Sequence, residues 1–279
     1  MTNPDPRYSF SAITRLRNSD RRAVQDRVAA EEPLEIRLAY IDPLKGPVHR
    51  SLAITMRTPG DDAALVAGFL FSESIIRRKS DIAHLDLSRS NVVRVQLHDD
   101  VRFDPQRLER HFYTTSSCGV CGKASLESLS TAGFEVIHDN SFRCSTDALK
   151  NLPALLNEKQ SLFNMTGANH GVALFDAAGN ITHVAEDVGR HNAMDKLVGH
   201  IMEADALPLQ NHGILVSGRA SFELMQKALA ARCPMLAAIG APSSLAVELA
   251  QEFNITLVGF LSERGMNIYQ GAENILEQD

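Results

Sequence analysis

Apolar and polar side chains alternate in three short stretches in the first third of the chain. Residues 34–40, 52–56 and 93–97 place an apolar side chain at every second position, which is typical of strands with one buried face. Residues 63–73 follow a cluster of capping residues and are predicted to form a helix between the second and third strands. We therefore expect a small α+β domain over residues 29–112.

The rest of the chain alternates predicted strands and helices. Two apolar runs, 171–175 and 181–185, flank a turn and are expected to pair antiparallel. Further short apolar runs at residues 213–216, 235–239 and 256–260 are separated by segments of helical periodicity. The predicted helices span residues 147–159, 190–201, 221–231 and 244–252. This order favours an α/β domain over residues 113–279, with parallel strands covered by helices.

Composition and charge narrow the class of protein. The chain has 279 residues, of which 44% are hydrophobic, and 34 acidic against 28 basic residues give a net charge of -6. This balance predicts no nucleic-acid partner and no anionic membrane, and no apolar run is long enough to span a bilayer. Residues 1–28 are rich in arginine and predict a mobile tail rather than a signal sequence. Four cysteines are too few for a disulfide framework and favour the cytoplasm.

Three junctions rich in glycine and serine follow the predicted core strands, at residues 216–221, 240–244 and 259–265. Right-handed crossovers bring the carboxyl ends of such strands to one edge of the sheet, where open α/β sheets bind ligands. Helix N-termini, serine hydroxyls and arginines there form an anion site. The side chains concerned are Ser217, Arg219, Ser243 and Arg264. The alternative is that the serines only cap helices.

A second polar cluster, residues 186–196, enters the helix predicted at residue 190. Asp187 can hold the tautomer or the charge of His191, and Arg190 and Lys196 add positive charge that favours an anionic partner. The alternative is a local network of salt bridges. His170, just before an apolar strand, either joins the site or is a core histidine. We expect the acidic net charge to be offset locally by Arg190, His191, Lys196, Arg219 and Arg264.

Cys118 and Cys121 form a C-x-x-C motif with three possible functions. A zinc site needs two more ligands, but Cys144 and Cys233 are isolated in the sequence. A dithiol oxidoreductase is expected to carry the motif between a strand and a helix, whereas here it lies in a small-residue loop. A sulfur carrier needs an accessible thiolate on such a loop, and the nearby Lys123 favours the thiolate form.

Segments along most of the chain resemble the FdhD family of formate dehydrogenase accessory proteins. They are Glu32-Pro33-Leu34, Thr58-Pro59-Gly60-Asp61-Asp62 and residues 68–70, 117–125, 186–196, 217–221, 241–248 and 257–260. The resemblance runs from about residue 30 to residue 270. It implies a sulfurtransferase that accepts sulfur from a cysteine desulfurase. It also implies that this sulfur goes to the molybdenum cofactor, bis-molybdopterin guanine dinucleotide, before insertion into apo formate dehydrogenase.

The same resemblance implies a cytidine-deaminase-like three-layer core with a mixed sheet, a smaller N-terminal α+β domain and a homodimer. Cys118 would carry the persulfide, with Cys121 as its partner. It places the segment from Phe260 through Leu261, Ser262, Glu263 and Arg264 to Gly265 at the cofactor. Together with the clusters above, the expected cofactor site also contains His170, Asp187, Arg190, His191, Ser217, Arg219 and Ser243.

A guanine nucleotide such as GDP is expected to mimic the cofactor at this site, and no zinc or other metal is expected. Zinc deaminases need a His-x-Glu motif, and none of the ten histidines is followed two residues later by glutamate. Two other functions stay open from the sequence. One is a non-catalytic chaperone that binds the cofactor for formate dehydrogenase, and the other is a dithiol oxidoreductase.

Overall fold

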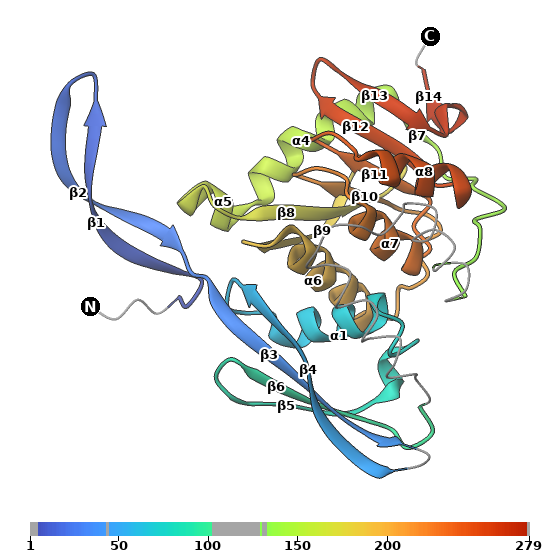
Figure 1. Ribbon diagram of the computed structural model, residues 1–279. Coiled ribbons are helices and arrows are strands. Elements are labelled where there is room, and N and C mark those ends of the chain that lie inside the picture. Colours follow the sequence, from blue (N-terminus) through green and yellow to red (C-terminus); the bar gives the residue numbers. More distant parts are fainter. Residues whose placement is uncertain (1–4, 43–44, 102–128, 130–132, 278–279) are drawn as a thin grey trace.

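The computed structural model describes residues 5–42, 45–101, 129 and 133–277, whose arrangement is shown in Figure 1. These residues form four β-sheets and six α-helices. The two larger sheets are separated by two helices that pack against each other, α1 (Asp62–Ser72) and α6 (Arg190–Glu203). The expectation of a mixed α+β protein is confirmed.

The chain begins with a two-stranded hairpin where we expected a tail without structure. Strand β1 (Tyr8–Arg17) pairs antiparallel with β2 (Asp20–Ala29) along its whole length. The two residues between them, Asn18 and Ser19, both have positive φ, of 46° and 68°, as the tightest hairpin turns require. Residues 8–29 therefore form a hairpin where we had predicted a mobile tail, because most side chains of β1 and β2 are exposed and leave no pattern of burial in the sequence.

The smaller of the two main sheets has the order β4-β3-β6-β5. Its strands are β3 (Glu32–Asp42), β4 (Gly46–Arg57), β5 (Ile82–Arg89) and β6 (Val92–Leu97), with a 3-10 turn, η1 (Lys79–Asp81), before β5. The alternation seen in the sequence buries every second residue of β3 under helix α1. The expected strands and helix are confirmed, whereas β5 escaped prediction because its apolar pattern is weak.

The larger sheet has six strands in the order β13-β12-β11-β10-β8-β9. They are β8 (His170–Phe175), β9 (Ile181–Asp187), β10 (Gly213–Val216), β11 (Met235–Ala238), β12 (Thr256–Ser262) and β13 (Gly265–Gln270). Strands β10, β11 and β12 run parallel to one another, and the other three run antiparallel to their neighbours. The expected mixed sheet, with an antiparallel pair before a parallel core, is confirmed.

Helices cover both faces of this larger sheet. Alternate residues of β10 show the division, since Leu215 packs on the side of α4 (Thr146–Lys159) and Ile214 packs on the opposite side. That opposite side holds α6, α7 (Phe222–Ala230) and α8 (Ser244–Glu252). The remaining short elements are α5 (Ser161–Thr166), η2 (Ala272–Asn274) and the paired strands β7 (Cys144–Ser145) and β14 (Ile275–Leu276). The core therefore has three layers, helix, sheet and helix.

The expected boundary between the two parts of the chain, near Phe112, lies outside the described residues. In the part of the chain that is described, no helix combines the length and apolar character needed to cross a bilayer.

Two glycines allow helices α1 and α6 to touch backbone to backbone. A Cβ atom added to Gly199 of α6 would overlap the carbonyl oxygen of Ala64, and one added to Gly68 of α1 would overlap that of Asp195. Such close approach is possible only without side chains at these positions. The helix pair thereby holds the two main sheets in a fixed arrangement.

We predict that Gly199→Ala lowers the free energy of unfolding by about 2 to 3 kcal/mol, because α1 must move away from α6. The stability lost through the separation of the two helices should exceed the gain of about 1 kcal/mol that alanine brings over glycine in a helix interior. Urea unfolding followed by circular dichroism measures the difference. Gly218→Ala is the matched control, since its Cβ would lie 3.4 Å from the nearest atom, Nδ1 of His170. Equal stability of the two variants would contradict the close helix contact.

Candidate anion-binding site

The three junctions after the parallel strands meet at one edge of the larger sheet. The N–H of Gly240 donates to the carbonyl of Gly218 at 2.9 Å, and the N–H of Phe260 donates to the carbonyl of Gly240 at 3.1 Å. A Cβ atom on Gly240 would come within 2.8 Å of the Gly218 carbonyl oxygen, so the glycine is required for this approach. The crossovers therefore bring the junctions together, as the order of the elements predicts.

Serine side chains at these junctions are used in two ways. Ser221 and Ser243 accept the N–H groups of Leu224 and Ala246, at 3.5 and 3.3 Å, and so cap helices α7 and α8. Ser217 instead accepts the N–H of Gly171 at 2.9 Å and ties β10 to β8. Ser243 thus caps a helix, while its hydroxyl proton stays available for a further hydrogen bond. The positive ends of α7 and α8 still face this edge, where they favour an anion.

The third junction differs from the other two because it leads into strand β13 instead of a helix. Ser262 donates its hydroxyl to the carbonyl of Gly265 at 3.1 Å and closes the turn, with Glu263 and Arg264 exposed at its tip. Leu261 is 1% exposed and belongs to the core on the α4 side, so its side chain is not available to a ligand. No helix N-terminus contributes at this junction.

Phe260 combines an unusual backbone with an exposed aromatic ring. Its φ of 53° lies in the left-handed region that bulky residues rarely adopt, and its side chain is 51% exposed. Backbone strain of this kind persists only where neighbouring contacts hold it, here the hydrogen bond to Gly240. The ring is therefore held at the sheet edge with a large part of its surface free for stacking.

Two histidines and one arginine complete the edge. Nε2 of His191 lies 3.5 Å from Oγ of Ser221 and 3.9 Å from the carboxylate of Glu223. Burial and the nearby Arg190 guanidinium lower the pKa of His170, and the same two causes lower the pKa of His191 to about 4. Nε of Arg190 is buried and has no hydrogen-bond partner among the described residues. Arg190 is thus a cation near His170 and His191 whose Nε–H donor is not used by any described residue.

Asp187 does not orient His191, contrary to our expectation. Its carboxylate is fully buried, lies 2.8 Å from Nζ of Lys196 and accepts the N–H groups of Thr58 and Gly189 at 3.1 and 2.9 Å. Lys196 is 2% exposed and forms an ion pair with Asp187, so its charge is not available to offset surface acidity. For these two residues the salt-bridge alternative is correct, because both side chains point inward from β9 and α6.

Thr58 is a central residue of this network, although we had named it only as the first residue of the segment Thr58-Pro59-Gly60-Asp61-Asp62. Its hydroxyl oxygen accepts the Asn169 amide at 2.9 Å and the N–H of Val188 at 3.1 Å, and its carbonyl accepts Nζ of Lys196 at 2.9 Å. The residue is fully buried. No local pattern signals this role, since every partner lies more than one hundred positions away in the chain.

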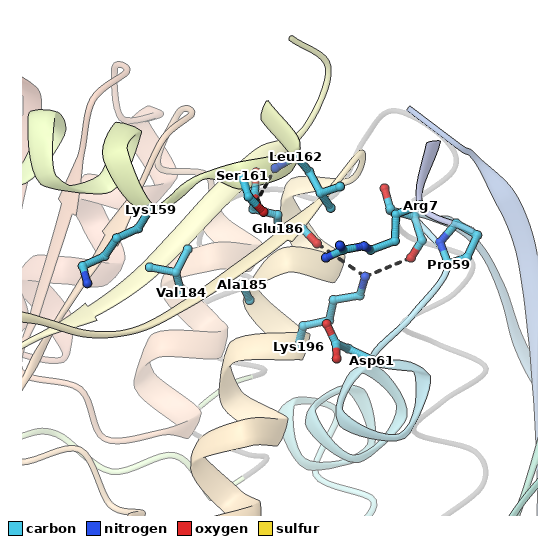
Figure 2. A pocket seen from close by; sticks show the side chains of 11 residues that line it. Arg7, Pro59, Asp61, Lys159, Ser161, Leu162, Val184, Ala185, Glu186 and Lys196 are labelled. Atoms are coloured by element: carbon cyan, nitrogen blue, oxygen red, sulfur yellow. Dashed lines mark hydrogen bonds between the residues drawn. The ribbon is translucent and has the colours of Figure 1, made fainter. Parts of the chain in front are cut away.

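A polar pocket of about 160 Å³ opens beside the network, between the root of the N-terminal hairpin, α5 and β9. Figure 2 shows the side chains of Arg7, Glu186 and Lys196 converging at one end of it, with Lys159 at the other. The Glu186 carboxylate accepts the N–H groups of Leu162 and Phe163 at 3.0 and 2.8 Å. The pocket therefore has a charged but largely paired lining.

Comparison with known proteins assigns the chain to a family. Residues 29–276 match the model of the FdhD/NarQ family. The chain belongs to the FdhD/NarQ family. "Sulfur carrier protein FdhD" of Streptomyces coelicolor is 47% identical over 273 residues, covering 94% of each chain. The protein of the same name from Sulfurisphaera tokodaii is 39% identical over 264 residues, covering 95% of this chain and 97% of its own.

A solved structure supports the fold. The crystal structure of a putative formate dehydrogenase accessory protein from Desulfotalea psychrophila matches 97% of this chain and 100% of its own, with a TM-score of 0.75 and 24% identity. The resemblance to the FdhD family drawn from the sequence is therefore confirmed by the family model and by the curated relatives.

The cysteines of this FdhD/NarQ family member fall into two groups. Cys118 and Cys121 lie outside the described residues. Cys144 and Cys233 are buried, and burial raises the pKa of their thiols to about 11 and about 12. These two thiols stay protonated and cannot serve as nucleophiles near neutral pH. In the part of the chain that the structure covers, no group of three metal-binding side chains comes together.

We predict that His191 makes the stability of the protein depend on pH in a defined direction. In the unfolded chain a histidine takes up a proton near its ordinary pKa of about 6.5, whereas the folded ring stays neutral until about pH 4. Its contribution is thus complete above pH 6.5 and is lost as the pH falls toward 4.

We therefore expect His191→Gln to lose less stability than the wild type between about pH 7 and about pH 5, measured by urea unfolding at both values. Arg190→Gln removes one cause of the low pKa and should act in the same direction. An unchanged pH dependence in both variants would mean that the His191 ring takes up its proton over the same pH range in the folded and the unfolded chain, which would contradict the lowered pKa.

Proposed function

We propose that this chain is a cytoplasmic sulfur carrier in the maturation of formate dehydrogenase. It accepts sulfur from a cysteine desulfurase as a persulfide on Cys118 and transfers it to the bis-molybdopterin guanine dinucleotide form of the molybdenum cofactor. The observation that carries this proposal is membership of the FdhD/NarQ family together with curated relatives named sulfur carriers at up to 47% identity. The cytidine-deaminase-like character of the core stays a prediction, which the three layers around parallel β10, β11 and β12 support.

The sheet edge offers groups that suit the phosphates and ring of such a cofactor. The N-termini of α7 and α8 supply free N–H groups, and Arg190 and Arg219 supply positive charge. The hydroxyls of Ser217 and Ser243 and the neutral rings of His170 and His191 can donate hydrogen bonds from the same side. The exposed face of Phe260 is a surface on which a guanine or pterin ring can stack. The unpartnered Nε of Arg190 supports an occupant that supplies an oxygen acceptor.

Sulfur transfer to Cys118 requires no oxidant. The Cys118 thiolate attacks the terminal sulfur of the desulfurase persulfide, the donor S–S bond breaks, and its electron pair leaves with the desulfurase thiolate. A later attack of the Cys121 thiolate on Sγ of Cys118 would form a disulfide and release the carried sulfur as hydrosulfide. The two thiols thereby reduce the carried sulfur by two electrons, which accounts for the paired cysteines.

Sulfur acceptance is tested by mass spectrometry. We expect the purified chain, incubated anaerobically with a cysteine desulfurase and L-cysteine, to gain the mass of one sulfur atom on Cys118, and Cys118→Ala to gain none there. Cys121→Ala is the matched control and should still accept sulfur. No adduct on the wild type, with the desulfurase shown to be active, would overturn the carrier function.

Occupation of the sheet edge is tested with GDP as the probe. We expect Arg190→Gln to weaken GDP binding at least about tenfold in calorimetry, because a charge-assisted hydrogen bond to phosphate contributes about 1.5 to 3 kcal/mol. Arg89→Gln, an exposed substitution on β5 in the other sheet, should bind as the wild type does. Equal affinity of both variants would place the nucleotide elsewhere.

A cofactor chaperone without sulfur transfer is the second candidate. It is favoured by the anion edge, whose helix N-termini, histidines, Arg190 and Phe260 come from residues 170–260. The double variant Cys118→Ala, Cys121→Ala separates the two functions. Continued maturation of formate dehydrogenase by this variant would support the chaperone, and loss of maturation with retained GDP binding would support the carrier.

A further inference from the structure

The polar pocket of about 160 Å³ has no part in the proposed function. It lies between Arg7 at the root of the hairpin, Pro59 and Asp61 before α1, and the edge of β9 (Figure 2). Strand β9 is the last strand on its side of the six-stranded sheet. One water needs about 10 to 15 Å³ of such space, so the pocket has room for a small organic molecule.

Two cations at one end of the pocket are already neutralised. The Arg7 guanidinium donates to both carboxylate oxygens of Asp5, from Nε at 2.9 Å and from Nη2 at 2.8 Å. Nζ of Lys196 lies 2.8 Å from the buried carboxylate of Asp187. Neither side chain therefore offers free positive charge to a molecule in the pocket.

Two further carboxylates give this end an excess of negative charge. The Asp61 side chain is 59% exposed and lies 3.8 Å from Nε2 of His200, a ring that carries charge only when it is protonated. The Glu186 carboxylate accepts two backbone N–H groups and keeps lone pairs for a further donor. The hydrogen bond to Asp5 raises the pKa of Arg7, and the charges of these two carboxylates raise it further. This end of the pocket therefore suits an ammonium group.

The opposite end of the pocket is positive. Lys159, the last residue of α4, lies there with an exposed side chain and forms no ion pair within the described ranges of the chain (Figure 2). Val184 and Ala185 of β9 lie between the two ends. The pocket thus presents a cation at one end and carboxylates at the other, separated by a short stretch of strand.

The edge of β9 supplies backbone groups to the middle of the pocket. Nζ of Lys196 donates to the carbonyl of Glu186 at 3.4 Å, and two residues further on the N–H of Val188 donates to the Thr58 hydroxyl at 3.1 Å. Both partners lie outside the sheet, so alternate residues here direct their N–H and C=O groups away from β8. Val184 belongs to this series and lines the pocket. Its backbone groups therefore face the position that an extended peptide unit would take.

We propose that the pocket binds a free dipeptide, with its ammonium group at Asp61 and Glu186 and its carboxylate at Lys159. A dipeptide carries these opposite charges at its two ends and an amide between them, which matches the order of groups along the pocket. The amide pairs with the backbone of Val184 as a short addition to the edge of the sheet. Binding of this kind does not depend on sulfur transfer or on the anion edge.

Calorimetric titration of the full chain with alanylalanine tests this site. We expect saturable binding of alanylalanine. N-acetyl-alanylalanine lacks the ammonium group and alanylalanine amide lacks the carboxylate, so each should bind at least about fivefold more weakly. No saturable binding of alanylalanine, or equal affinity for all three compounds, would overturn the proposal.

Two variants assign the two ends of the dipeptide. Lys159→Gln should weaken the binding of alanylalanine about three- to fivefold and leave that of alanylalanine amide unchanged, because the amide has no carboxylate to lose a partner. Asp61→Asn, which keeps a side chain that tolerates the φ of 56° at this position, should weaken alanylalanine similarly and leave N-acetyl-alanylalanine unchanged.

Lys79→Gln is the matched control, since it removes an exposed lysine outside the pocket and should bind alanylalanine as the wild type does. Equal weakening of the free and the blocked compounds in both pocket variants would show an indirect effect on the fold and would overturn the assigned ends.

Discussion

The buried pair of Asp187 and Lys196 is the interaction on which the rest of the structure depends. Both side chains are at most 2% exposed, and charges so far from water are tolerated only when each is paired and hydrogen-bonded. Part of this satisfaction comes from β9 and α6, but Thr58, just after β4, supplies an N–H to Asp187 and a carbonyl to Lys196. A residue that directly follows a strand of the smaller sheet therefore completes the hydrogen bonding of an ion pair between β9 and α6. The first turn of α6, which carries Arg190 and His191, is held in place by the same contacts.

A second buried ion pair involves Asp195, the residue of α6 directly before Lys196. Nζ of Lys227 on α7 lies 2.8 and 2.9 Å from the two carboxylate oxygens of Asp195, and the Ser72 hydroxyl donates to the same carboxylate at 3.0 Å. Ser72 belongs to α1, which also touches α6 through the two glycines. Charge pairing and backbone contact thus fix one helix, α6, against both of its neighbours. Arg190, at the start of α6, is consequently carried by a helix that is held on two sides.

The sequence alone predicts the elements and their meeting edge better than the contacts inside the site. Strict alternation identifies β3, a short apolar run identifies β10, and helical periodicity identifies α6 and α8, because burial dictates the side-chain pattern. The partner of Asp187 could not be predicted in the same way. His191 and Lys196 are both near Asp187 in the sequence, and only the packing of α6 decides which side chain points inward. Thr58 is harder still, because its partners are distant in the chain. The hairpin at residues 8–29 escapes because its apolar residues are exposed, so burial leaves no pattern to find.

The final arrangement changes which groups of the edge are available for the anion that we propose to bind there. Of the five groups expected to supply positive charge, Lys196 is neutralised by Asp187, and His191 is neutral near pH 7 because burial and Arg190 lower its pKa to about 4. Arg190 itself produces part of that neutrality, so the arginine and the histidine cannot both be cations here. The attraction for an anion therefore rests on the arginines and on the helix N-termini. In the proposed function the neutral imidazoles contribute directed hydrogen bonds instead of charge, so charge attraction and selectivity come from different side chains of one edge.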